Sequence, residues 1–420
     1  MPTSLSVDRR RFLRFVTAAT ASVALPATLL PESLYPASAF AADSAAKLPT
    51  AAEFIKGKDA RLIVHSVKTG EIETPLKLLR EHAVTPKQIL FVRNNQKLDG
   101  ALTTDGSTQR DWTIDLSGLL DTPRSITVDE LSKLPQRDVE LVLQCSGNSR
   151  TRFEKSVKAE GVPWQHGAMG NVVYRGVMLR DVVEKLGLNL KPSAKFVAVE
   201  GRDVPLMSDA PDFEHSVPLA DALDRSMLAL SMNGEPMPKV HGGPVRFIVP
   251  GYYATMNVKW VSKVRFEEAE STNHHHVDRY RTPLAPIKPG TPFKSTLANS
   301  EPNWNMRIKS VIFSPLESDR VAAGDVKVTG VAWNDGQTRI VAVEVSTDDG
   351  QTWRRAQMSY PSSPYAWHAW QITIGVKPGK TTIQSRAIDA LGRSQPLDGA
   401  VAWTPAGYCW SGVDAVTIDV

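Results

Sequence analysis

Cysteine is scarce in this 420-residue chain, which has only Cys145 and Cys409. Two cysteines exclude a disulfide-rich scaffold, a zinc site made of paired Cys-x-x-Cys motifs and a c-type haem attachment site. The formal net charge of +4 is small for this length, and no basic run carries interleaved aromatic residues. We therefore expect no nucleic-acid partner, although a modest positive balance would favour the approach of an anionic substrate.

Long apolar runs are also missing, apart from a mild one near the N-terminus. Asp8-Arg9-Arg10-Arg11-Phe12-Leu13 precedes an Ala- and Thr-rich segment from Phe15 to Leu30, and Ala39-Phe40-Ala41 has the small-x-small pattern of a cleavage site. A membrane-spanning helix needs about 20 strongly apolar residues, so an export signal is favoured over a membrane anchor. The arginine pair resembles a twin-arginine signal.

We therefore predict that residues 1–41 are a twin-arginine signal peptide and that the protein is exported, already folded, to the periplasm. Export in the folded state is typical of proteins that receive a cofactor in the cytoplasm. No later segment has the length and apolarity of a spanning helix, so we expect no membrane span in the mature protein.

The segment from about Thr50 to Val264 mixes strand-like and helix-like patterns. Residues 89–92, 139–143, 195–199 and 245–249 are short apolar runs typical of buried strands. Residues 128–131 and 179–186 have the pattern of short amphipathic helices, and Gly187 stands where a glycine ends a helix. The pattern predicts a mixed α/β or α+β domain.

A proline-rich stretch, residues 281–302, separates this part from an almost purely β pattern. The stretch has no periodicity and is predicted to connect two domains. Beyond it, four segments alternate or run apolar, and Asp349-Gly350 and Pro378-Gly379 supply turns: 307–313, 326–331, 340–345 and 381–387. Short strands at this spacing predict an immunoglobulin-like sandwich. We place the domains at 42–290 and 291–420.

The segment Gln144-Cys145-Ser146-Gly147-Asn148-Ser149-Arg150 places a cysteine directly after a predicted strand. Thiolates bind soft metals, and a neighbouring cation lowers the pKa of a thiol. From the residues alone, Cys145 is either a metal ligand, a buried free cysteine or the disulfide partner of Cys409.

Three motifs resemble those of the sulfite oxidase family, which includes assimilatory nitrate reductases. Residues 145–150 resemble the family's Cys-Ala-Gly-Asn-x-Arg, residues 91–95 its Phe-x-Arg-Asn-His, and residues 232–246 its Asn-Gly-x-x-Leu-Pro-x-x-His-Gly-x-Pro-x-Arg, which continues to Trp260. The resemblance implies an α+β fold. Its parts would be a sulfite-oxidase-type molybdopterin domain of mixed α/β structure and an immunoglobulin-like dimerisation domain, so we expect a homodimer.

The resemblance also implies the site residues. Cys145 would be the metal ligand of a molybdenum-molybdopterin cofactor. Five residues would contact the pterin or its phosphate: Asn95, Asp203, His241, Arg246 and Lys259. A phosphate favours cationic partners. By their residue type alone, Arg246 and Lys259 could instead be solvated surface charges.

Three residues would act on the substrate: Arg93, Arg150 and Tyr280, the last as a hydrogen-bond donor or proton relay. By residue type alone, Tyr280 could be an ordinary packing tyrosine. This chain departs from the family at Asn95, where many relatives have histidine. It also has Tyr365 and His368 near the place where the family has a pocket arginine from its C-terminal domain.

His274-His275-His276 is the remaining cluster of potential ligands. Consecutive residues point in different directions and rarely bind one metal together. We interpret the cluster as an exposed loop, with a role at the mouth of the pocket as the alternative.

The function implied by the resemblance is the oxidation of sulfite by a sulfite dehydrogenase. No haem, flavin or NAD motif occurs in the sequence, so the electrons would pass to an external acceptor such as a c-type cytochrome. One alternative is a periplasmic molybdenum reductase of methionine sulfoxide or other S- or N-oxides. Another is a non-catalytic pterin-binding assembly protein.

Overall fold

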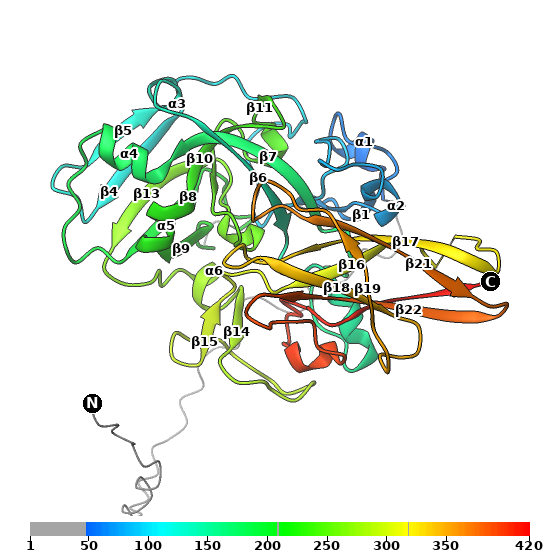
Figure 1. Ribbon diagram of the computed structural model, residues 1–420. Helices are drawn as coiled ribbons and strands as arrows, with labels where there is room; N and C mark the ends of the chain where they lie inside the picture. Colours follow the sequence, from blue (N-terminus) through cyan, green and yellow to red (C-terminus); the bar gives the residue numbers. More distant parts are fainter. Residues whose placement is uncertain (1–47, 208–209, 318) are drawn as a thin grey trace, which may run out of the picture. The chain divides into compact units, whose positions relative to one another are not determined.

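A computed structural model describes residues 48–207, 210–317 and 319–420 (Figure 1). The predicted signal peptide, residues 1–41, lies outside the described residues. Among the helices that are described, none combines the length and the apolar character needed to cross a membrane.

The first described elements form a small three-stranded sheet with two one-turn helices. The strands are β1 (Ile63–Ser66), β2 (Glu71–Glu73) and β3 (Val92–Arg93), and the helices are α1 (Ala51–Phe54) and α2 (Leu76–Leu79). The predicted strand of residues 89–92 was wrong for residues 89–91, because β3 begins only at Val92. The amides of Ile89 and Leu90 both donate to the carbonyl of Pro86, at 3.1 and 2.9 Å, and so close a turn instead of pairing with a strand.

Two five-stranded sheets follow. One contains β6 (Arg137–Gln144), β7 (Met169–Met178), β10 (Met227–Met232), β11 (Glu235–Pro236) and β12 (Arg246–Ile248). The other contains β4 (Thr113–Gly118), β5 (Arg124–Thr127), β8 (Phe196–Gly201), β9 (Glu214–Pro218) and β13 (Val261–Glu267). Buried side chains from both sheets, among them Val142, Val199 and Phe266, form one apolar core.

Four short helices accompany these sheets: α3 (Val128–Ser132), α4 (Leu179–Lys185), α5 (Leu219–Arg225) and α6 (His274–Val277). Helix α3 starts with a capping box, in which Thr127 and Glu130 each accept the other's backbone N–H. Gly187 follows α4 with a φ of 62°, a left-handed conformation that suits glycine. The two predicted helices are thereby confirmed.

The proline-rich stretch has more structure than its sequence predicts. Its ends pair as the antiparallel strands β14 (Arg281–Pro283) and β15 (Ser300–Pro302). The domain limits proposed from the sequence stay predictions.

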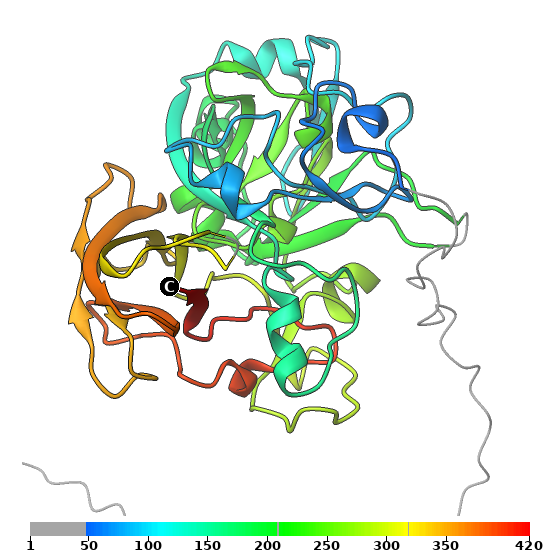
Figure 2. The same ribbon diagram turned by 90° about the vertical axis from the view of Figure 1, so that its right-hand side faces the viewer.

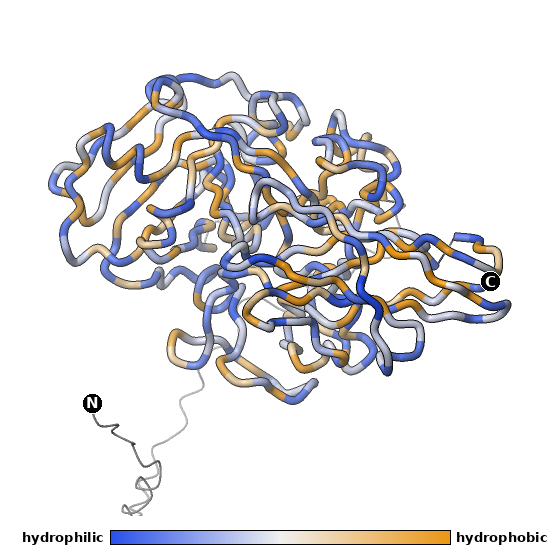
Figure 3. The backbone as a smooth tube through the Cα atoms, viewed as in Figure 1, coloured by the Kyte–Doolittle hydropathy of each residue, from blue (hydrophilic) through white to orange (hydrophobic). Residues whose placement is uncertain are grey.

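The C-terminal part contains two four-stranded sheets, as the alternating pattern predicts. One contains β16 (Lys309–Ser314), β17 (Gly324–Trp333), β20 (Gln357–Met358) and β21 (His368–Val376). The other contains β18 (Ile340–Ser346), β19 (Arg354–Arg355), β22 (Lys380–Asp389) and β23 (Asp414–Asp419). Burial alternates along β22, and Figure 3 shows apolar stretches along the strands. Side chains of both sheets form a separate core.

Residues of the C-terminal part form hydrogen bonds with the end of β6 and the turn that follows it. Trp333 Nε1 donates to Gln144 Oε1 at 2.8 Å, and the amide of Cys409 donates to the carbonyl of Ser146 at 2.7 Å. Lys309 Nζ donates to Ser149 Oγ at 2.6 Å. In Figure 2 the 3₁₀ helix Arg150–Lys155, drawn in teal, lies beside the red C-terminal segment. The conformation around Cys145 therefore depends on residues far away in the sequence.

Replacing Trp333 tests this dependence. Trp333→Phe leaves the buried Gln144 Oε1 without its donor, so the free energy of unfolding should fall by about 1–3 kcal/mol. The measurement is urea unfolding of the folded protein. Trp353→Phe is the matched control, because its indole donates to Gly350 O in a partly exposed turn where water replaces the lost partner. Equal decreases in the free energy of unfolding for the two variants would contradict the stabilising role of the Trp333–Gln144 hydrogen bond.

Candidate active site

All but one of the predicted site residues line a single cavity, and the exception is Arg150. The cavity residues are Arg93, Asn95, Cys145, Asp203, His241, Arg246, Lys259 and Tyr280. They come from the ends of several strands: Arg93 ends β3, Cys145 follows β6, and Tyr280 precedes β14. The fold thus brings together residues that are up to 187 positions apart in the chain, from Arg93 to Tyr280.

Cys145 lies at the base of a tight turn with its side chain only 7% exposed. Its amide donates to Ala168 O at 2.9 Å, and its carbonyl accepts from the amide of Asn148 at 3.0 Å. Burial raises the pKa of the Cys145 thiol, while the backbone N–H of Gly147 and the cations Arg150 and Arg93 act in the opposite direction. Both cysteines are free, so the disulfide alternative was wrong.

Basic side chains converge on another part of the cavity. His241 is 1% exposed and Arg246 3%. Lys58, which is 4% exposed, places Nζ 2.9 Å from His241 Nε2. Burial, together with the neighbouring Lys58, Lys259 and Arg246, lowers the pKa of His241 well below its usual value. His241 is therefore a neutral hydrogen-bonding group at physiological pH.

The partners of these cations are neutral oxygens. Lys58 donates to the carbonyls of Lys87 and Leu90 at 2.7 and 2.6 Å, and Lys259 donates to Asn94 Oδ1 at 2.5 Å and Val240 O at 2.9 Å. Arg246 donates to the carbonyls of His241 and Asn257, at 3.0 and 3.1 Å. The interpretation of Arg246 as a surface charge was wrong.

The charge of the cavity fits an anionic cofactor. Among the described residues that line it, Asp203 is the only carboxylate. Burial lowers the pKa of Lys58 and of Lys259 well below the usual lysine value, and a bound phosphate would favour their charged forms. Arg246 and Lys259, which line the cavity, would hold the phosphate, with Lys58 behind His241 adding to the positive potential, and Cys145 would supply the thiolate ligand of the metal.

Asp203 gives the cavity a group that titrates near neutral pH. Burial raises its pKa to about 7, although its own backbone N–H and the nearby Lys259 act in the opposite direction. A carboxyl group with such a pKa can donate or accept a hydrogen bond. This property fits contact with a neutral heterocycle such as a pterin.

Asn95, found where many relatives have histidine, links the two predicted substrate residues at the cavity. Its Oδ1 accepts from Arg93 Nη2 and from the hydroxyl of Tyr280, both at 2.7 Å. Arg93 also donates to Glu71 Oε1 at 3.2 Å. An amide accepts these bonds without adding a negative charge, so the pocket keeps its attraction for anions.

Arg150 lies behind the cavity. Its side chain is 7% exposed and donates to the carbonyls of Val162 and Ala406 at 2.5 and 2.8 Å. Its guanidinium lies 5.7 Å from the ring centroid of Tyr408. It can influence the site through its charge, and its predicted contact with substrate stays a prediction.

Tyr408, a C-terminal residue that no sequence motif indicated, contacts a residue of the cavity. Its ring stacks on Tyr280 with 5.1 Å between centroids. Tyr365 and His368, which occur near the expected position of a pocket arginine, do not line the cavity among the described residues. Lys58 was also missed, because Lys56-Gly57-Lys58-Asp59 has the polarity of an ordinary surface loop.

The histidine triplet is not an exposed loop. His274–Val277 forms helix α6, and His276 is 0% exposed. Within the described ranges, no group of three or more His, Cys, Asp or Glu side chains is arranged to hold a metal ion. His276 instead contacts a second buried histidine, His215, which the sequence gave no reason to select.

Comparison with known proteins agrees with this geometry. Residues 101–275 match the family model of an oxidoreductase molybdopterin binding domain, and residues 300–413 match that of a Mo-co oxidoreductase dimerisation domain. The chain is 31% identical over 356 residues to mitochondrial sulfite oxidase of Rattus norvegicus. The chain belongs to the sulfite oxidase family. That alignment covers 82% of this chain and 63% of the relative.

Other members of the sulfite oxidase family show the same relation. The mitochondrial sulfite oxidase of Homo sapiens is 30% identical, with the same coverage. Nitrate reductase [NADH] 2 of Phaseolus vulgaris is 28% identical and is covered over 40% of its length, against 80% of this chain. Thus the chain spans less than two thirds of these curated relatives.

The fold matches the solved sulfane dehydrogenase SoxCD of Paracoccus pantotrophus with a TM-score of 0.69. The identity is 24%, and the match covers 94% of this chain and 96% of the solved chain. The predicted fold class and the molybdenum-molybdopterin cofactor are confirmed.

Lys259 provides a direct test of cofactor binding. Lys259→Met removes one charge-assisted contact, worth about 1.5–3 kcal/mol, so affinity for the cofactor should fall about 10- to 100-fold. The measurement is molybdenum and pterin content after purification and dialysis. Lys263→Met is the control, because Lys263 lies on the same segment, is 45% exposed and pairs with Glu200. Undiminished cofactor in Lys259→Met would contradict the assignment.

Proposed function

We propose that this protein is a periplasmic sulfite dehydrogenase, which oxidises sulfite to sulfate and passes the electrons to an external acceptor such as a c-type cytochrome. The main support for the proposal is one cavity with three kinds of residue. It is lined by a buried cysteine, by basic side chains without carboxylate partners, and by Arg93 and Tyr280, which both bond to Asn95. The sulfite oxidase relatives support the same substrate.

The residues of this chain have distinct tasks in the reaction. Sulfite and water give sulfate, two protons and two electrons; the molybdenum cofactor, when bound, accepts the electrons and transfers the oxygen atom. Arg93 binds the oxyanion by charge-assisted hydrogen bonds. The Tyr280 hydroxyl donates its one proton to Asn95 Oδ1 in this structure and would turn it to the oxyanion when sulfite binds, holding sulfite in place.

Two further features concern the acceptor and the assembly. The twin-arginine pattern supports periplasmic export, where c-type cytochromes are available as acceptors. The match of residues 300–413 to a dimerisation domain supports a homodimer.

The decisive assay is the sulfite-dependent reduction of cytochrome c by molybdenum-loaded protein. Wild type should reduce cytochrome c with sulfite. Cys145→Ser should lose activity by more than about 100-fold, because losing even an outer-shell contact of a metal site lowers metal affinity or activity by about 10- to 100-fold. Cys409→Ser, which changes the other buried cysteine, should retain activity. Loaded wild type that ignores sulfite with every acceptor would refute the proposal and favour the reduction of methionine sulfoxide or related oxides. Folded protein that never acquires molybdenum would favour an assembly role.

Asn95 tests whether an added negative charge beside Arg93 weakens the binding of sulfite. Asn95→Asp keeps the shape and the acceptor oxygens but adds a negative charge beside Arg93, so KM for sulfite should rise at least about tenfold. Steady-state kinetics normalised to molybdenum content provide the measurement. Asn95→His is the control, because histidine is the common residue in the family and should keep KM close to wild type. An unchanged KM in Asn95→Asp would contradict the role of Arg93.

A further inference from the structure

Two buried histidines outside the roles assigned above lie in direct contact. His215 on β9 is 1% exposed, and His276 on α6 is 0% exposed. Their Nδ1 atoms are 3.0 Å apart. Two ring nitrogens at this distance form a hydrogen bond only when one carries a proton and the other does not.

The outer nitrogens of the pair point toward opposite ends. Thr255 Oγ1 lies 3.2 Å from His215 Nε2, and Thr255 lines the cavity. At the other end, His276 Nε2 lies 3.5 Å from Glu270 Oε1, and the Glu270 side chain is 17% exposed. An unbroken series of polar groups therefore joins the cavity to a carboxylate that solvent can reach.

The series has two hydrogen-bonding orders. In one, the Thr255 hydroxyl donates to His215 Nε2, His215 Nδ1–H donates to His276 Nδ1, and His276 Nε2–H faces Ser216 Oγ at 3.1 Å and the ionised Glu270 at 3.5 Å. In the other, His276 Nδ1–H donates to His215, and His215 Nε2–H donates to Thr255. Transfer of the Thr255 proton to His215, of the His215 Nδ1 proton to His276 and of the His276 Nε2 proton to Glu270 converts the first order into the second. Glu270 then releases its proton to solvent and Thr255 takes a new one from the cavity, so one proton moves outward, and both imidazoles return to their first tautomers before the next proton passes.

The surroundings keep His215 neutral and the terminal carboxyl ionised. Burial lowers the pKa of His215, and the neighbouring His276 and His275 add to this effect. Burial acts to raise the pKa of Glu270, but His276 and Arg281 outweigh it and keep that pKa low. Tyr280 also faces His215, with 5.5 Å between ring centroids. A neutral imidazole can accept and donate at once, as a relay requires.

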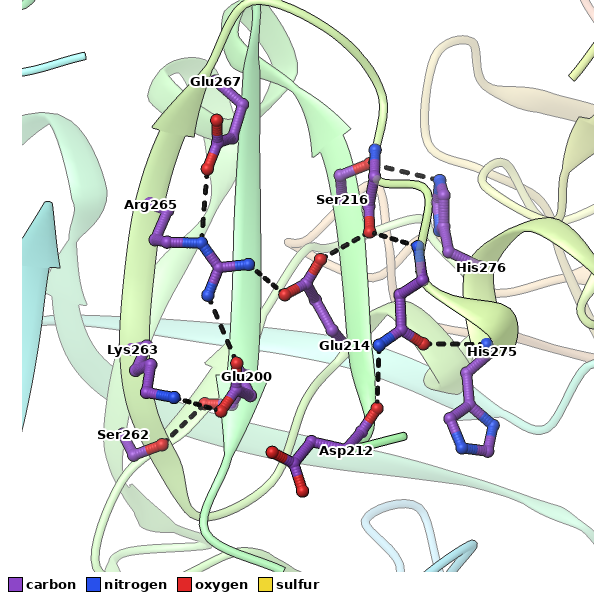
Figure 4. A network of polar contacts seen from close by, with 12 residues as sticks. Glu200, Asp212, Glu214, Ser216, Ser262, Lys263, Arg265, Glu267, His275 and His276 are labelled. Carbon is purple, nitrogen blue, oxygen red and sulfur yellow. Dashed lines mark hydrogen bonds and ion pairs between the residues drawn. The ribbon is translucent and has the colours of Figure 1, made fainter. Parts of the chain in front are cut away.

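A side branch from His276 leads away from solvent. Figure 4 shows Ser216 Oγ beside His276, at 3.1 Å, and Glu214 paired with Arg265. Ser271 joins them, since its amide donates to Ser216 and its hydroxyl to Glu214. Glu214 is 8% exposed and already paired, so Glu270 is the end of the series that exchanges with solvent.

We propose that Thr255, His215, His276 and Glu270 form a proton relay between the catalytic cavity and solvent. The inference rests on the proposed function, in which each sulfite oxidised releases two protons from water while two electrons pass to a one-electron acceptor protein. The relay gives these protons a route out of the cavity through residues that form no described hydrogen bond with Cys145, Lys58, Arg246 or Lys259.

The test measures the rate at which cytochrome c reoxidises the reduced enzyme, separately from the oxidation of sulfite. Molybdenum-loaded enzyme is reduced with titanium(III) citrate and mixed with cytochrome c in H₂O and in D₂O. His276→Gln and Thr255→Val should slow reoxidation by up to about 100-fold, the scale of a lost proton-transfer group, and the solvent isotope effect should change. Imidazole added to His276→Ala should restore part of the rate. His274→Gln, on the same helix turn, should behave as wild type.

A second readout needs no turnover. Cofactor-free wild type should show a slowly exchanging imidazole N–H proton in NMR spectra, which His276→Gln abolishes and His274→Gln keeps. Folded, molybdenum-loaded Thr255→Val and His276→Gln that reoxidise at the wild-type rate with the wild-type isotope effect would overturn the relay. If wild type ignores sulfite but the variants still slow reoxidation after titanium reduction, the proposed substrate fails and the relay stands.

Discussion

Basic side chains buried without carboxylate partners are the constraint on which the rest of this protein depends. Lys58, Arg246 and Lys259 bond to carbonyl and amide oxygens, while His241 is kept neutral among them. Such an arrangement is costly in an isolated domain. It becomes favourable when an anionic cofactor binds, because the binding free energy then adds to the stability of the folded state. The cofactor-free site is thus prepared for one class of ligand.

The C-terminal sandwich completes this site as well as supplying the dimerisation domain. Trp333 and Lys309 hold the residues on either side of Cys145, and Tyr408 stacks on Tyr280. The orientation of the Cys145 thiol and of Tyr280 therefore depends on packing across the two parts of the chain. A change in the sandwich can alter catalysis without contact with the cofactor.

Local patterns predicted the strands and helices well, because alternation and capping act over a few residues. The strand of residues 139–143 and the sandwich strands follow from such patterns, whereas the strand prediction failed at Ile89 and Leu90 because Pro86 accepts their amides in a turn. The motifs located Cys145, His241 and Arg246 in the site. Lys58 and the His215–His276 pair depend on tertiary contacts between distant segments, and no local sequence pattern distinguishes them from ordinary loop and core residues.

The most direct test of metal binding by Cys145 is X-ray absorption at the molybdenum edge, comparing wild type with Cys145→Ser. If the buried thiolate binds the metal in the cavity, the variant, where it retains molybdenum, has one sulfur neighbour fewer than wild type and one light atom more. Identical spectra for the two proteins would contradict this binding, because the metal would then be bound without Cys145.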